Sequence, residues 1–124
     1  MKNRMLRSIG SALKGFSIIL KEERNFRIQN IVAIIVIVLM NIFPLSIVEK
    51  GILLLLIVII LVLEMFNSIM ERLLDIFKPR MHAYVKDIKD IAAGTVLISA
   101  VGAIIIGVII FYPHLKFFLT FIKR

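Results

Sequence analysis

Cysteine is absent from this chain of 124 residues, and histidine occurs only twice. The missing cysteine excludes a disulfide framework and a metal site built on thiolates. Two histidines are too few for a zinc site of ordinary composition. Acidic residues are scarce as well, 8 against 16 Lys and Arg, so the formal net charge is +8. In a soluble protein this positive charge would suggest a nucleic-acid partner.

Long polar stretches are missing too. The chain is 60% hydrophobic and its mean hydropathy is +1.02, which is typical of an integral membrane protein. We therefore interpret the charges by their position along the chain and expect no nucleic-acid partner. The N-terminus lacks the compact apolar core and the cleavage site of a signal peptide. The length favours a single domain over residues 1–124.

The pattern of apolar residues predicts an all-α integral membrane protein with three membrane helices, at about 28–43, 46–77 and 88–112. Pro79 and Pro113 are expected to end the second and third of these helices. Residues 1–24 place apolar side chains on one helical face and Arg7, Lys14 and Lys21 on the other. This pattern favours a helix on an anionic membrane surface. The alternative is an amphipathic helix packed against the rest of the protein.

Basic residues are concentrated before the first predicted membrane helix and after the second. Lys50 stands alone in the loop between them, so the positive-inside rule places the N-terminus and the second loop in the cytoplasm. The basic C-terminus, which this orientation places outside, disagrees with the rule, but the cytoplasmic side still carries more basic residues. The three groups are Lys2, Arg4, Arg7, Lys14, Lys21, Arg24 and Arg27; then Arg72, Lys78, Arg80, Lys86 and Lys89; and finally Lys116, Lys123 and Arg124.

A polar face interrupts the apolar pattern of the second membrane helix. Glu64, Asn67, Glu71 and Asp75 follow a long aliphatic run at i, i+3, i+7 and i+11, which places them on one helical face. A charge near the centre of a bilayer costs about 2.5–3.5 kcal/mol on insertion scales. Such groups usually have partners, and we expect multivalent cations and phosphates to bind here. For Asp75, a simple ion pair with Lys78 or Arg72 is the alternative.

Other charged residues are expected at the same level of the membrane, namely Glu23 before the first membrane helix and Lys89 and Asp90 at the third. Carboxylates bind Mg²⁺ together with substrate phosphates, and lysine neutralises phosphate charge. A nearby carboxylate can take the proton of an attacking hydroxyl. This set suffices for phosphoryl transfer. The Walker and protein-kinase glycine motifs are absent, so a nucleotide site would have to be built from membrane helices.

At these residues the chain resembles the small bacterial membrane diacylglycerol kinase and undecaprenol kinase family. Residues 64–71 read Glu-Met-Phe-Asn-Ser-Ile-Met-Glu and Asp75 follows, where the family reads Glu-x-x-Asn-[Thr/Ser]-Ala-x-Glu-x-x-x-Asp. Residues 89–97, Lys-Asp-Ile-Ala-Ala-Gly-Thr-Val-Leu, look like the family's Lys-Asp-x-Ala-Ala-Gly-Ala-Val-Leu. Residues 22–28, Glu-Glu-Arg-Asn-Phe-Arg-Ile, look like a stretch of the Gram-positive members. His82 matches the family's loop histidine.

The resemblance implies a homotrimer of three-span subunits in the bacterial inner membrane, each with a surface helix at its N-terminus. It implies transfer of phosphate from ATP to a lipid alcohol at sites shared between neighbouring subunits. Among the residues of this chain, Glu64 would be the general base and Asn67 would orient the base or the phosphate. Glu23 and Glu71 would hold Mg²⁺. The nucleotide would be bound by Arg4, Asp75, His82, Lys89 and Asp90.

Two departures from the family pattern bear on the substrate. Ile69 replaces an alanine beside the catalytic face, and Gln29 replaces the family's Glu or His. The stretch over residues 22–28 favours undecaprenol as the acceptor, with diacylglycerol as the alternative. A small ion-coupled exporter is a more distant alternative, although such a carrier would place its acid near the membrane midplane.

Overall fold

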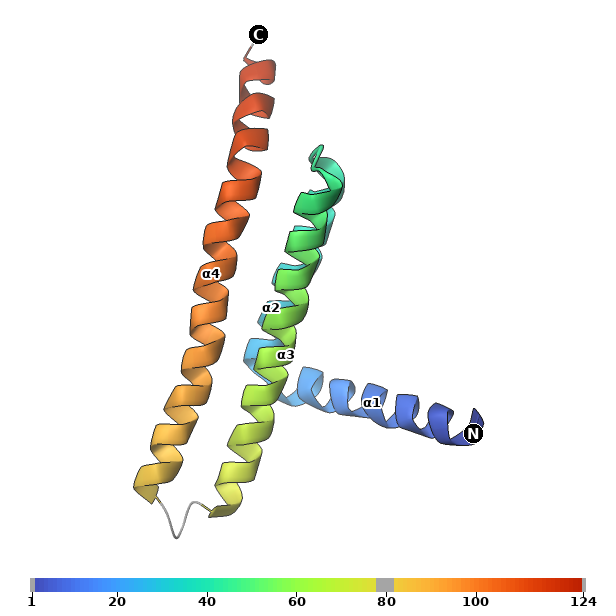
Figure 1. Ribbon diagram of the computed structural model, residues 1–124, viewed down its shortest axis with the longest axis vertical. Helices are drawn as coiled ribbons and strands as arrows, with labels where there is room; N and C mark the ends of the chain where they lie inside the picture. The colour runs from blue at the N-terminus through green and yellow to red at the C-terminus, as the bar shows by residue number, and fades with distance from the viewer. Residues whose placement is uncertain (1, 78–81, 124) are drawn as a thin grey trace.

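The computed structural model is all-helical and describes residues 2–77 and 82–123 (Figure 1). Its helices are α1 (Lys2–Glu22), α2 (Arg24–Ile42), α3 (Ile47–Phe77) and α4 (His82–Ile122). The last three are long and apolar enough to cross a membrane. The prediction of an all-α, multi-pass membrane protein is therefore confirmed.

The junction between α1 and α2 turns sharply, so α1 projects sideways from the other helices (Figure 1). Glu23 alone separates the two helices, and its backbone is extended. The Arg27 guanidinium donates hydrogen bonds to the carbonyls of Leu20 and Lys21, at 3.3 and 2.6 Å, which satisfies carbonyls that the end of α1 leaves without helical partners. Phe26 is fully buried against the ring of Phe16. These contacts hold α1 across the end of α2.

The turn between α2 and α3 closes the opposite end of the bundle. The Ser46 N–H donates to the Glu49 carboxylate (2.7 Å), and the Glu49 N–H donates to the Ser46 hydroxyl (3.2 Å). This reciprocal pair is a capping box, which fixes the start of α3. Behind it, Phe43 meets the rings of Phe111 and Phe118 of α4 edge-on. The main buried cluster lies beside this turn and contains Met40, Leu45, Leu53 and Ile110.

The three long helices line an apolar groove that is open on one side. α3 packs against both α2 and α4, and a cavity of about 490 Å³ is lined by residues of all three helices. Its lining is aliphatic and aromatic except for Gln29, and it extends along α3 as far as Ile60 and Leu61. The groove therefore ends close to the polar face of α3.

The prediction that Pro113 ends the third membrane helix is wrong. Pro113 lies inside α4, which begins at His82 and continues to Ile122. A proline removes one backbone hydrogen bond, which membrane helices tolerate where neighbouring groups compensate. Here Phe118 packs against Phe43 beyond the proline. The expected end of the second helix at Pro79 lies outside the described residues, as do Lys78 and Arg80.

Candidate functional site

Buried polar side chains gather on one face of α3. Glu64, Asn67 and Ser68 are 5%, 8% and 3% exposed, so each needs a partner to offset the loss of hydration. The Asn67 amide donates a hydrogen bond to the Glu71 carboxylate at 3.2 Å. The amide oxygen of Asn67 is buried and has no hydrogen-bond partner within the described part of the chain. This oxygen remains able to accept a hydrogen bond from a bound molecule.

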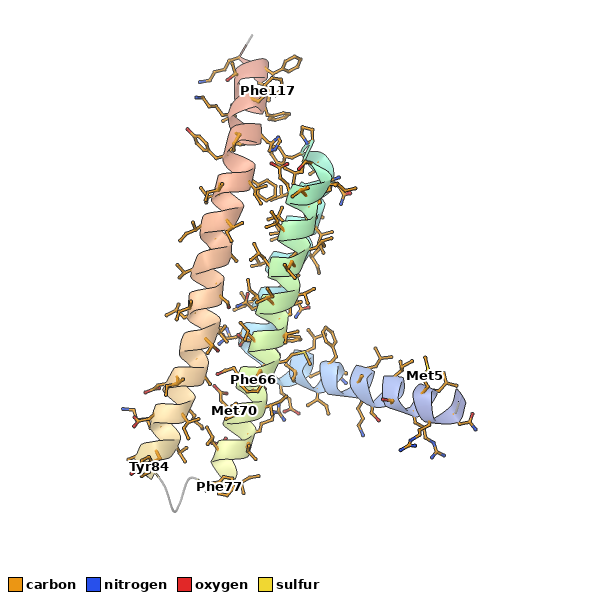
Figure 2. The ribbon with its side chains drawn as sticks, in the orientation of Figure 1. Met5, Phe66, Met70, Phe77, Tyr84 and Phe117 are labelled. Atoms are coloured by element: carbon orange, nitrogen blue, oxygen red, sulfur yellow. The ribbon has the colours of Figure 1, made fainter. Side chains whose placement is uncertain are left out.

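Glu23 reaches this face from the α1–α2 junction. Its carboxylate accepts hydrogen bonds from the Ser68 hydroxyl (2.9 Å) and from Arg72 (3.5 Å). Arg72 also forms an ion pair with Glu22 at 2.7 Å. Residues 45 to 50 positions apart in the sequence are thus joined at one level of the bundle, beside Phe66 and Met70 in Figure 2.

Sequence reasoning missed the positions of Ser68 and Arg72 as supports for Glu23. It treated Arg72 only as an alternative partner of Asp75 and assigned Ser68 no role. A signal was available, because Glu64, Ser68 and Arg72 follow one another at intervals of four residues and so share a helical face. The missing information was the direction in which the α1–α2 junction turns.

Three carboxylates converge on this face. The charges of Glu23 and Glu71 both act on Glu64, and neighbouring carboxylates that repel one another favour binding of a cation. Among the described residues, no group of three or more His, Asp or Glu side chains could by itself hold a metal ion. Mg²⁺, however, is commonly held by one or two carboxylates and completes its shell with substrate phosphates. Glu23 and Glu71 are carboxylates of the type that such a donor set uses.

A basic cluster on α4, made of His82, Lys86 and Lys89, lies at the same end of the bundle as the carboxylates of α3. Lys89 forms an ion pair with Asp75 of α3. His82, Lys86 and Lys89 line a cavity of about 220 Å³ together with Val85. Asp90 is exposed one residue beyond Lys89. The structure therefore brings four of the predicted nucleotide-binding residues, Asp75, His82, Lys89 and Asp90, to the same end of the bundle as the carboxylates.

Arg4 is the predicted site residue that a single chain does not bring to the others. It is exposed on α1, near the free end of that helix, where Figure 2 labels Met5. It lies 19 positions before Glu23 in the sequence, about 28 Å along a helix. A role for Arg4 at a nucleotide would require the α1 helix of another subunit.

Sequence comparisons with known proteins identify the family to which the chain belongs. Residues 10–111 match the family described as prokaryotic diacylglycerol kinase. The undecaprenol kinase of Bacillus subtilis is 36% identical over 113 residues, which cover 91% of this chain and 92% of that protein. The diacylglycerol kinase of Synechocystis is 31% identical over 112 residues, which cover 90% of this chain and 64% of that protein. The chain therefore belongs to the prokaryotic diacylglycerol kinase family and is an ATP-dependent lipid kinase, a transferase with an alcohol acceptor.

Proposed function

We propose that this kinase phosphorylates undecaprenol in the bacterial inner membrane, with diacylglycerol as the second candidate. The observation that carries the catalytic part is the convergence of Glu23, Glu64 and Glu71 beside Asn67 at one end of the apolar groove. Two observations favour undecaprenol over diacylglycerol. The undecaprenol kinase is the more similar of the two relatives, and residues 22–28 contain the sequence Glu-x-Asn-Phe-Arg-Ile.

In this proposal Glu64 takes the proton of the lipid hydroxyl. The hydroxyl oxygen then attacks the γ-phosphorus of ATP, and the bond from that phosphorus to the bridging oxygen of ADP breaks. Glu64 is buried, and the groove lining at Ile60 and Leu61 lies about one helical turn away along α3. A lipid chain in the groove would therefore place its hydroxyl close to this carboxylate.

Asn67 would position the reacting groups. Its amide N–H₂ group holds Glu71, and its buried oxygen still has a lone pair to accept a hydrogen bond. The oxygen can therefore accept a hydrogen bond from the lipid hydroxyl and hold it beside Glu64 before that proton passes to the carboxylate. Positioning of this kind accounts for much of the rate acceleration in phosphoryl transfer.

Glu23 and Glu71 would hold Mg²⁺ against the phosphates of ATP. The ion would neutralise phosphate charge during transfer. Ser68 and Arg72 keep the Glu23 carboxylate in place, and Asn67 does the same for Glu71. Lys89 would bind phosphate oxygens, and Asp75, His82 and Asp90 would line the nucleotide site around it.

A homotrimer would complete the site. One chain leaves the groove between α2, α3 and α4 open and holds Arg4 far from the acids. A neighbouring subunit would cover the groove and would bring its own Arg4 to the site. Ser99, Ala103 and Gly107 on α4 would allow close helix packing. The N-terminus would be cytoplasmic, with α1 on the membrane surface and the carboxylates facing the side where ATP is available.

The decisive experiment is an assay of the purified protein with ATP and Mg²⁺ on undecaprenol and on diacylglycerol, in matched mixed micelles. We expect faster transfer to undecaprenol, measured as kcat/KM for each lipid. A higher kcat/KM for diacylglycerol would reverse the substrate assignment. Failure of folded protein to phosphorylate any lipid alcohol would refute the proposed catalytic arrangement.

A further inference from the structure

The last part of α4, residues 112–122, lies beyond the stretch that matches the family. α4 has 41 residues, about 62 Å at 1.5 Å per residue, which is twice the roughly 30 Å of a bilayer core. Figure 2 shows Phe117 at one end of this helix and Tyr84, on the side of the carboxylates, at the other. The segment therefore lies at the end of the bundle away from the kinase site.

The charges of α4 indicate where the membrane ends along this helix. Between Asp90 and Lys116 the chain carries no Asp, Glu, Lys or Arg. The 25 residues between them would span about 37 Å as a helix, slightly more than the hydrocarbon core. The region from Tyr112 onwards therefore reaches the interface between hydrocarbon and lipid headgroups.

This segment has two different faces. Tyr112, Lys116, Thr120 and Lys123 recur at intervals of four, four and three residues, and they line a shallow cavity of about 290 Å³ with Leu115 and Leu119. Phe117 and Phe121 lie on the other side of the helix and are 73% and 74% exposed. At the end of a membrane helix, Lys side chains extend towards the lipid headgroups and aromatic side chains lie at the interface, which fits this distribution.

Among the described residues, the positive charge of this face has no acidic partner. No Asp or Glu follows Asp90, and in the part of the chain that the structure describes neither Lys116 nor Lys123 forms an ion pair. The acid at this end, Glu49, accepts a hydrogen bond from Ser46 and lies 3.4 Å from the His114 ring. The two ammonium groups therefore remain available to anions outside the chain.

We propose that residues 112–123 form a binding surface for anionic phospholipid headgroups in the leaflet away from the kinase site. Phe117 and Phe121 lie at the boundary between the headgroups and the apolar part of that leaflet. Lys116 and Lys123 extend their charged ends to lipid phosphates, with Tyr112 and Thr120 donating hydrogen bonds beside them. Packing of Phe118 on Phe43 and of His114 against Glu49 fixes this surface to the α2–α3 turn. The surface is independent of the substrate that the kinase uses.

The absence of tryptophan from the chain provides a clean reporter. Phe121→Trp would be introduced into the full-length protein, which is then reconstituted in phosphatidylcholine vesicles containing phosphatidylglycerol. Tryptophan quenching would be compared for spin-labelled phosphatidylglycerol and spin-labelled phosphatidylcholine. We expect phosphatidylglycerol to be enriched near the reporter, roughly fivefold for each lysine that contacts the anionic surface.

Two further variants, both carrying the reporter, decide the outcome. The double variant Lys116→Gln/Lys123→Gln should lose the preference for phosphatidylglycerol. The control Lys50→Gln should keep it, because Lys50 lies near the same end of the bundle but outside this face. Equal quenching by the two lipids, or a preference that survives loss of both lysines, would overturn the proposal. Two other results would also overturn it. Loss of the phosphatidylglycerol quenching on addition of inorganic phosphate would indicate a site for free anions. Tryptophan emission that changes with the density of protein in the vesicles would indicate that a second copy of the chain occupies the surface.

Discussion

Glu64 occupies the boundary between the apolar and polar parts of α3, and its assignment as the base can be tested directly. Glu64→Gln keeps the shape of the side chain and removes the proton acceptor. We expect kcat to fall by about 10²- to 10⁴-fold, the usual contribution of general acid–base catalysis, with ATP affinity nearly unchanged. Turnover and ATP binding would be measured on the same preparation.

The stability of the variant provides the control for this prediction. A carboxylate that only pairs with a basic residue of a neighbouring helix would, when replaced, weaken the assembly and spare turnover. A stable Glu64→Gln protein with normal kcat would exclude the base assignment.

Glu71 should act through its charge. In Glu71→Gln an amide oxygen can still accept the hydrogen bond from Asn67, so the local contact survives while the negative charge is lost. We expect activity to be abolished because a neutral amide is a poor ligand for Mg²⁺. Rates would be measured across a Mg²⁺ titration. Recovery of near-normal rates at saturating Mg²⁺ would contradict a metal role, and Glu23→Gln should behave like Glu71→Gln.

Arg72 should position Glu23 without contributing much to stability. Its ion pairs with Glu22 and Glu23 involve partly exposed side chains, and such pairs contribute about 0–1 kcal/mol. Arg72→Gln should therefore raise the Mg²⁺ concentration needed for half-maximal activity with little change in thermal stability. Glu22→Gln is the matched control, because it leaves the contact of Arg72 with Glu23. Equal Mg²⁺ dependence in both variants would show that Arg72 does not act through Glu23.

Among the elements, the capping box at the start of α3 gives a test of the fold that is separate from catalysis. Ser46→Ala removes one of the two reciprocal hydrogen bonds with Glu49 and should destabilise the protein by about 1 kcal/mol. Thermal unfolding in detergent would measure this loss. Ser17→Ala on α1 serves as the control. An equal effect of both substitutions would show that the cap contributes nothing specific to the bundle.

The elements also show what the sequence could and could not specify. The apolar runs predicted three membrane helices, and the spacing of Glu64, Asn67 and Glu71 predicted a shared face, because both patterns depend only on helical periodicity. The hydrogen bond between Ser68 and Glu23 depends on the direction of the α1–α2 junction, which no local pattern encodes. The continuation of α4 through Pro113 was missed because the packing of Phe118 on Phe43 overrides a local propensity.

At the scale of the whole molecule, complementation between inactive chains tests whether one site draws its acids from neighbouring subunits. A Glu64→Gln chain and a Glu23→Gln chain should each be inactive alone. If the acids of one site come from different subunits, mixed trimers should regain part of the activity, measured after co-reconstitution. Within one chain, however, the structure already joins Glu23 to Ser68 on the face that carries Glu64. No recovery, despite demonstrated mixing, would assign Glu23 and Glu64 of one site to a single subunit.

The single extended residue between α1 and α2 has a mechanical consequence. α1 is 21 residues long, about 31 Å, and it ends one residue from a carboxylate proposed to hold the metal. If α1 lies on the membrane surface, a tilt of this helix is transmitted directly to Glu23 at its end. A change in bilayer thickness or curvature that tilts this helix would then move the Glu23 carboxylate relative to Glu71. The rate of lipid phosphorylation would in that way respond to the physical state of the membrane that supplies the substrate.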